Sequence, residues 1–283
     1  MENYVALLGT KGGPAIRTGS TNPTSSLLCL AGQRVVVDCG LGVTRGLVDQ
    51  GMALKDLDQI VISHLHSDHY IELGPLLHTA WVAGLRTPVV VHGPEGLSDY
   101  WKHFLASMQY DIAIRVEDEG RPDLASLVRI ETVDPAQSFA IGPLTVHSML
   151  TEHPPVTCHA FRFEGAGKAV VFSGDTAYMP QMADFADGAD LLIHEAMLGE
   201  ALPALLARIG NGDGRLMHHW LRAHTLAADV AKIAAKARVK ALALHHLIPS
   251  DDPAFGEKEW RDSVAADWTG TFHLGHDGMR IDL

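Results

Sequence analysis

Short apolar runs rich in β-branched residues alternate with amphipathic stretches along the whole chain. A run of about 4–8 apolar residues indicates a buried strand, whereas apolar residues three or four positions apart indicate a helix. The clearest helix is HTLAADVAKIAAKA, residues 224–237, which carries lysines near its end. The pattern predicts strands at 3–8, 25–30, 34–38, 58–63, 88–92, 128–133, 144–150, 159–163, 168–173, 189–194, 239–245, 271–274 and 278–282. It predicts helices at 43–51, 69–83, 95–107, 178–186, 198–208, 224–237 and 256–266.

Each half of this pattern places strands before helices. The most polar stretch, EDEGRPDLAS at residues 117–126, separates the halves. An apolar sheet face must be covered by another layer, so we expect two packed sheets with helices outside. The sequence therefore predicts an α/β fold in a single domain spanning residues 1–283, with the boundary between its two αβ halves near 117–126.

Composition and charge narrow the class of protein. The chain has 283 residues, of which 47% are hydrophobic, enough for a substantial core. The formal net charge of −12 would repel a phosphate backbone, so a nucleic-acid partner is disfavoured. No apolar run is long enough for a transmembrane helix, and the opening MENYVALLGT predicts a strand rather than a signal peptide. The scattered cysteines Cys29, Cys39 and Cys158 favour a reducing, cytoplasmic location over a disulfide framework.

The residues with the clearest chemistry lie in HLHSDH, residues 64–69, which follows the apolar run DQIVIS. Residues two positions apart in a strand face the same side, so we expect His64 and His66 to point together. Asp68 and His69 would follow a turn and point back from the start of a helix. Imidazole and carboxylate groups that converge in this way are typical zinc ligands, and catalytic zinc sites leave a position open for water.

Three further strand ends supply the remaining ligands of a two-metal site. His153 closes VHSMLTEH, Asp175 follows the apolar AVVFSG, and His246 closes VKALALHH. Open sheets build active sites from polar residues that apolar strands deliver to one rim. These donors suit two Zn²⁺ ions per chain, and Mn²⁺ or Fe²⁺ would also be accepted. The expected ligands are His64, His66 and His153 at one ion, Asp68, His69 and His246 at the other, and Asp175 bridging both.

The order of these motifs resembles that of the metallo-β-lactamase superfamily: HLHSDH, then a lone histidine, then SGDT, then a histidine at a strand end. The resemblance covers nearly the whole chain. It implies an αββα four-layer sandwich and a dinuclear, usually zinc, hydrolase. LLGTKGGPAIRTGSTNPTSSLL, LLIHEA (191–196) and RAHTLAADVAKIA (222–234) resemble the ribonuclease Z-like branch. The resemblance to that branch implies a supporting pair, Glu195 and His224, and a homodimer.

Two departures from ribonuclease Z argue against tRNA processing. That enzyme carries a long arm between the lone histidine and the bridging aspartate, whereas His153 and Asp175 are 22 positions apart (175 − 153). The stretch HHLIPSDDP also lacks the arginine that follows the final histidine in that enzyme. PLLHTAWVAGLRTPVVVHGPEGL and HLIPSDDP resemble instead an arylsulfatase-like sub-branch, whose enzymes act on small esters. We therefore expect a small-molecule ester as substrate.

These features lead to a hypothesis of metal-assisted ester hydrolysis, of aryl sulfate or phosphodiester type. A hydroxide bridging the two ions would attack, because zinc lowers the pKa of water from about 15.7 toward about 7. Asp68 would bind metal and pass a proton. His224, held by Glu195, would stabilise the transition state or protonate the leaving oxygen.

The substrate class stays open at this stage. Tyr70, Trp81 and Trp101 would wall an apolar pocket for the organic part of the ester. A lactonase or another carbonyl hydrolase would use the same metals, and a fold alone does not choose between these chemistries. A non-catalytic metal-binding protein is disfavoured, because a purely structural site needs no open position.

Overall fold

Two sheets of seven strands each form the centre of the fold in the computed structural model, which describes residues 2–210 and 212–283. The first sheet has the order β14-β1-β2-β3-β4-β5-β6, and the second has the order β13-β12-β11-β10-β9-β8-β7. The strands are β1 (Tyr4–Gly9), β2 (Ser25–Leu30), β3 (Gln33–Cys39), β4 (Gln59–Val61), β5 (Val89–Gly93), β6 (Val128–Thr132), β7 (Ser138–Ile141), β8 (Leu144–Leu150), β9 (His159–Gly165), β10 (Lys168–Phe172), β11 (Leu191–Met197), β12 (Ala241–Ile248), β13 (Thr271–Leu274) and β14 (Met279–Asp282).

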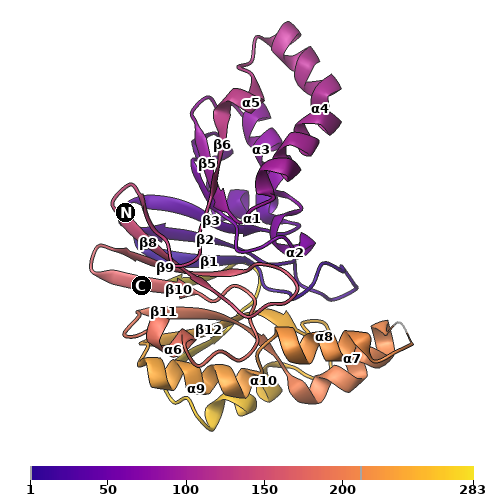
Figure 1. Ribbon diagram of the computed structural model, residues 1–283, viewed down its shortest axis with the longest axis vertical. Helices are drawn as coiled ribbons and strands as arrows, with labels where there is room; N and C mark the ends of the chain where they lie inside the picture. The colour runs from indigo at the N-terminus through magenta and orange to yellow at the C-terminus, as the bar shows by residue number, and fades with distance from the viewer. Residues whose placement is uncertain (1, 211) are drawn as a thin grey trace.

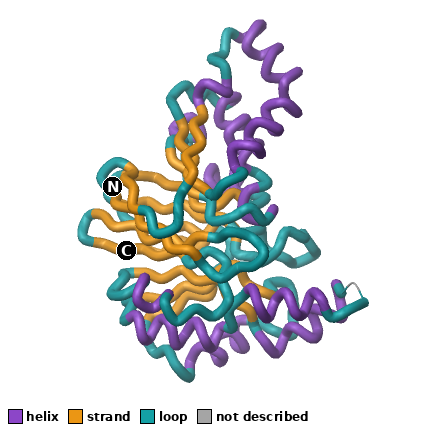
Figure 2. The backbone as a smooth tube through the Cα atoms, in the orientation of Figure 1, coloured by secondary structure: helices purple, strands orange, loops and turns teal. Residues whose placement is uncertain are grey.

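Helices cover the outer side of each sheet, so the layers follow the order helix, sheet, sheet, helix (Figures 1 and 2). This arrangement confirms the αββα sandwich expected from the sequence. The helices of the first half are α1 (Val43–Asp49), α2 (Ser67–Tyr70), α3 (Leu73–Val82), α4 (Leu97–Glu119) and α5 (Leu124–Leu127), with a 3₁₀ turn η1 (Leu54–Asp56). Those of the second half are α6 (Met182–Phe185), α7 (Leu202–Ile209), α8 (Arg215–Ala223), α9 (Ala227–Ala237) and α10 (Glu257–Ala265), with a 3₁₀ turn η2 (Gly199–Ala201).

The central strands carry apolar residues at successive positions, because both of their faces are buried. In β1, Val5 and Leu7 pack between the sheets, whereas Ala6 and Leu8 pack under the helices of the first half. The layer between the sheets also receives Phe161 of β9. Burial of a side chain of this size stabilises a fold by about 1.5–3 kcal/mol, so this layer holds the two sheets in a fixed relation.

The structure differs from the predicted elements where local pattern and tertiary packing diverge. Helix α4 continues to Glu119, beyond the expected 95–107. Its second half is largely exposed and gains support from Arg115, which pairs with Asp111 and Glu119 at 2.9 Å each. The chain passes from the first sheet to the second between β6 and β7, after the polar stretch 117–126 that we expected to mark this passage.

The segment between β11 and α9 also differs from the prediction. After the expected helix at 198–208 it contains a second helix, α8, which was not predicted from the sequence. His224 follows the last residue of α8 and has extended backbone angles, instead of opening a helix. This extended conformation places His224 in the connection between α8 and α9, with its side chain beside Glu195 of β11.

Candidate metal centre

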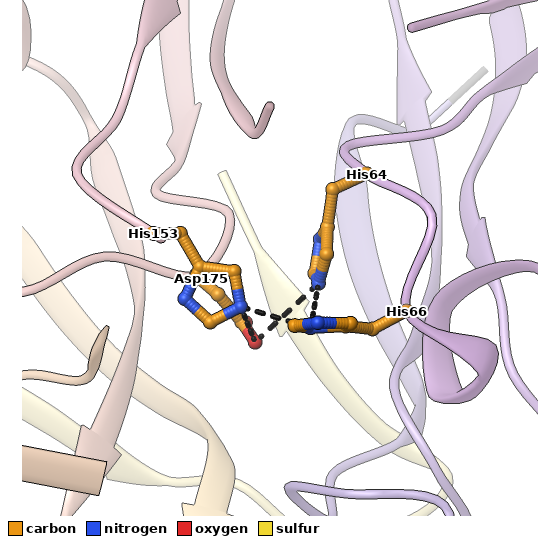
Figure 3. A group of neighbouring side chains, drawn as sticks. All are labelled: His64, His66, His153 and Asp175. Atoms are coloured by element: carbon orange, nitrogen blue, oxygen red, sulfur yellow. Dashed lines mark hydrogen bonds and ion pairs between the residues drawn. The ribbon is translucent and has the colours of Figure 1, made fainter. Parts of the chain in front are cut away.

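The predicted metal ligands lie together at one edge of the sandwich, and both sheets contribute. His64 follows β4 of the first sheet, and α2 then carries Asp68 and His69. In the second sheet, β8 and β10 end shortly before His153 and Asp175, and His246 lies near the end of β12. Figure 3 shows His64 and His66 approaching from one side, and His153 and Asp175 from the other.

The first group of donor atoms consists of three imidazole nitrogens and one carboxylate oxygen. His66 Nδ1 lies 3.1 Å from His64 Nε2 and 2.9 Å from His153 Nε2. Asp175 Oδ2 lies 3.7 Å from His64 Nε2 and 3.6 Å from His153 Nε2. Four ligands at zinc bond lengths in a tetrahedron are about 3.4 Å apart. The observed spacing therefore fits one ion.

The second group is richer in carboxylate. Asp68 Oδ2 lies 3.6 Å from His69 Nε2 and 3.3 Å from His246 Nε2. Asp175 Oδ2 is 3.5 Å from His69 Nε2 and 3.1 Å from His246 Nε2. One oxygen of Asp175 thus faces both groups, which is the geometry that a bridging ligand requires.

Two buried atoms support the fit of a metal to these residues. Within the described part of the chain, His69 Nε2 and Asp175 Oδ1 are buried without a hydrogen-bond partner. A buried polar atom without a partner costs about 1–3 kcal/mol, so native structures rarely leave one. A cation bound between these side chains would satisfy both atoms.

Outer contacts orient several of these side chains. Asp38 Oδ2 accepts a hydrogen bond from His69 Nδ1 at 2.8 Å, and Asp38 in turn accepts from the backbone and hydroxyl of Ser63 at 2.7 and 2.9 Å. His153 Nδ1 donates to the backbone oxygen of Ala223 at 2.8 Å. Carboxylate and carbonyl partners of this kind fix the tautomer of a metal-binding histidine. Asp38 was not among the predicted site residues, although an aspartate after the apolar run VVV of β3 is a signal of the same kind as Asp175.

Burial and neighbouring charges set the protonation of the group. Burial lowers the pKa of His64 well below its usual value and lowers that of His153 to about 4. Burial alone would also lower the pKa of His69, but the carboxylates of Asp175, Asp38 and Asp68 raise it well above its usual value. Two of these imidazoles are therefore neutral at pH 7, and neutral imidazole is the form that binds a metal.

Glu195 and His224 form a pair beside the metal ligands. His224 Nδ1 lies 3.1 Å from Glu195 Oε1 and 4.0 Å from Asp175 Oδ2. Burial raises the pKa of Glu195, and the Glu195 carboxylate outweighs the burial of His224 and raises the pKa of that imidazole to about 9. His224 is close enough to Asp175 and His246 for one atom from each to face a common ion. The pair expected from the sequence is thus brought together at the centre.

The aromatic residues expected to wall a pocket lie elsewhere. Trp81 and Trp101 belong to the core between the first sheet and its helices, and Trp81 Nε1 donates to the backbone oxygen of Pro122. Tyr70 packs edge-on against Tyr100, with ring centroids 4.9 Å apart. These rings lie on the faces of their helices that pack onto the first sheet, so they belong to the core. None of the three lines the cavity at the metal centre.

A cavity of about 310 Å³ opens beside the metal ligands. Lys11 and Arg17 line one part of it, and helices α7 and α8 supply an apolar wall that includes Leu205, Leu216 and Trp220. His219 of α8 also lines the cavity, and its ring centroid is 5.8 Å from that of His224. His219 was not among the predicted site residues, because a single histidine outside any motif gives no signal of its own.

Three further expectations concern an arm that would grip RNA, a membrane-spanning helix and the state of the cysteines. Residues 153–175, all of which are described, hold only β9, β10 and short connections, so no long arm lies between His153 and Asp175. Among the helices described, none combines the length and apolar character that crossing a bilayer demands. Cys29, Cys39 and Cys158 are buried free thiols.

Comparison with known proteins agrees with this architecture. Residues 4–207 match the family model described as anti-Pycsar protein Apyc1. A ribonuclease Z from Mycobacterium sp. (strain KMS) is 31% identical over 287 residues, which cover 99% of this chain and 95% of the relative. The metallo-β-lactamase fold protein YhfI from Bacillus subtilis superposes with a TM-score of 0.74 at 22% identity, with 100% of both chains covered. A diphosphatase from the PhnP family gives a TM-score of 0.68 at 17% identity, over 99% of this chain and 98% of the other.

These matches agree with the motif order and with the convergence of the predicted ligands from two sheets. The chain belongs to the metallo-β-lactamase superfamily, in its ribonuclease Z-like branch and in the family described as anti-Pycsar protein Apyc1, and is a metal-dependent hydrolase that acts on ester bonds.

Proposed function

We propose that the protein hydrolyses a small phosphodiester with two zinc ions. The observation that carries this proposal is the composition of the cavity, where the candidate metal centre faces cationic side chains on one part and an apolar wall on another. A volume of about 310 Å³ lies at the lower end of the range for small-molecule sites, about 300–1,000 Å³. The cavity therefore suits a compact anionic ester with an apolar organic group.

One observation favours phosphorus as the attacked atom, and a second favours an anionic ester over a neutral one such as a lactone. Proteins similar to this chain are named ribonuclease Z and diphosphatase, and both names denote phosphorus–oxygen bond cleavage. Lys11 and Arg17 add positive charge to a cavity in a chain of net charge −12. A local cationic surface in an acidic protein attracts a small anion while the rest of the surface repels a long polyanion.

The residues of the centre divide the work of hydrolysis in this proposal. Bound zinc would supply a water of lowered pKa and neutralise charge that develops on the phosphoryl oxygens. Asp68 would hold metal and accept a proton from the attacking water. His224, oriented by Glu195 through Nδ1, would donate a proton from Nε2 to the leaving oxygen.

A hydrolysis panel on zinc-loaded protein tests the substrate class. We expect an aryl phosphodiester such as bis(p-nitrophenyl) phosphate to exceed p-nitrophenyl sulfate and a γ-lactone by at least about tenfold in kcat/KM. Chelation should abolish the activity, and added zinc should restore it. A faster rate on the sulfate or the lactone would move the proposal to that chemistry. Specific cleavage of precursor tRNA at catalytic enzyme concentration would contradict a small-molecule substrate.

A matched pair of variants on α8 tests the apolar wall. Leu216 lines the cavity, whereas Leu221 of the same helix is 57% exposed. Leu216→Asp should raise KM for the aryl ester by about tenfold, because it places a charge beside the apolar and anionic substrate. Leu221→Asp should leave KM unchanged. Equal effects of the two changes would contradict substrate contact with this wall.

A further inference from the structure

Lys11 is buried, which is rare for a lysine. Only 2% of the residue is exposed, and it ranks among the largest fully buried side chains. A buried ammonium group is costly unless its donors are satisfied. The ammonium of Lys11 donates to the backbone oxygens of Gly12 at 2.7 Å and Gly13 at 2.8 Å. The side chain therefore folds back and closes its own turn.

The turn closed by Lys11 contacts both segments that carry ligands of the second metal group. The backbone N–H of Gly13 donates to Asp68 Oδ2 at 2.8 Å. The backbone N–H of Gly12 donates to the oxygen of Leu247 at 3.1 Å, next to His246 in the chain. A Cβ atom at Gly12 would come within 3.0 Å of the His246 ring, so the turn lies directly against this ligand. Among the described residues, no hydrogen bond joins this turn to His64, His66 or His153 of the first group.

A second anchor holds the far end of the same loop. Arg17 Nε lies 2.5 Å from Asp251 Oδ2, and the Asp251 side chain is almost fully buried. Arg208 of α7 approaches the other oxygen of Asp251 at 3.4 Å. The loop that follows β1 is thus fixed at Lys11 on one side and at Arg17 on the other. These two anchors fix the position of the Gly13 N–H group, and therefore the geometry of its hydrogen bond to Asp68.

We propose that Lys11 is a positioning residue for the second metal ion. Its ammonium holds the carbonyls of Gly12 and Gly13 in one orientation, so that the Gly13 N–H fixes Asp68 Oδ2 toward His69 and His246. Loss of the ammonium removes the donor from these two partly buried carbonyls, and the turn then relaxes away from Asp68. This inference rests on the proposed two-metal site, and it concerns metal affinity independently of the substrate.

Zinc titration against a chromophoric chelator tests the inference with Lys11→Met. We expect the weaker of the two zinc affinities to fall by about 10–100-fold and the tighter one to stay within about threefold, as for other outer partners of metal ligands. At zinc concentrations that refill the site, the metal content should return to two ions per chain, which separates a weakened metal affinity from destruction of the site. A purely structural role for Lys11 would lower both affinities together with the melting temperature.

Conservative and control variants sharpen the experiment. Lys11→Arg keeps donors for both carbonyls, so the weaker affinity should be at least partly restored. Lys240→Met removes a lysine that pairs with Asp190 on the surface, and it should change neither affinity. If Lys11→Met does not fold, Lys11→Gln serves instead, and its shorter amide should weaken the same ion. Unchanged zinc affinities in a folded variant at Lys11 would overturn the proposal. Failure of the phosphodiester panel alone would leave it intact.

Discussion

The two metal groups are built in different ways although they share Asp175. The first group draws three imidazoles from two segments, and its outer contacts come from neutral groups, the backbone oxygen of Ala223 on His153 and the hydroxyl of Ser63 on His64. The second group pairs two imidazoles with a carboxylate, and its outer contacts come from the Asp38 side chain and the Gly13 backbone. A hydrogen bond to a carboxylate is stronger than one to a neutral group, so the second group depends more on a single outer side chain, Asp38. The second group should therefore be the one that mutation and chelation affect first.

We expect the largest loss of metal and activity from a change at Asp175, the residue that both metal groups share. Asp175→Ala removes an oxygen that lies within 3.1–3.7 Å of a donor nitrogen in each group. We expect loss of both ions from elemental analysis after dialysis, and a fall in activity of at least about 10⁴-fold, since two-metal hydrolysis needs both. Retention of one tightly bound zinc would show that the first group holds its ion without the bridge.

The next effect separates metal binding from proton transfer. His224→Ala should lower kcat by about 10²–10⁴-fold on a phosphodiester with a poor leaving group, because general acid help is lost. Glu195→Gln should cost about 10–100-fold, and the double variant should be little worse than His224→Ala. Both single variants should keep two zinc ions.

The leaving group supplies the control for this prediction. A p-nitrophenyl leaving group needs little protonation, so it should hide much of the His224→Ala defect, whereas a phenyl or alkyl leaving group should reveal it. Equal activity of His224→Ala and the unmodified protein on both substrates would exclude a proton donor at this position. Loss of zinc from His224→Ala would instead assign the imidazole to metal binding with Asp175 and His246.

The smallest effect tests the asymmetry of the outer contacts directly. Asp38→Asn should weaken the weaker zinc affinity by about 10–100-fold and leave the tighter one unchanged. Asparagine tolerates the left-handed backbone of Asp38, where φ is 61°, so the fold should be retained. Asp49→Asn on exposed α1 is the control and should change neither affinity. Equal weakening of both ions by Asp38→Asn would remove the distinction between the groups.

Local pattern was sufficient to predict the layers and the convergence of the candidate ligands, but not every element. Apolar strands that end in histidine or aspartate gave the convergence of His64, His153 and Asp175, because strand ends meet at one rim of a sandwich. The same pattern misled for Trp81, since helical spacing alone does not say which face meets a cavity. The contacts of Asp38 and Lys11 stayed hidden, because they depend on segments that approach only in the folded chain.

The division of ligands between the sheets has a mechanical consequence. HLHSDH is attached to the first sheet, whereas His153, Asp175 and His246 are attached to the second. The apolar layer around Phe161 between the sheets therefore acts as a spacer that sets the gap across which each ion must reach. A spacer that is one methylene too thick would stretch every bond across that gap at once. We therefore expect a substitution in this core layer to change the retention of both metal ions.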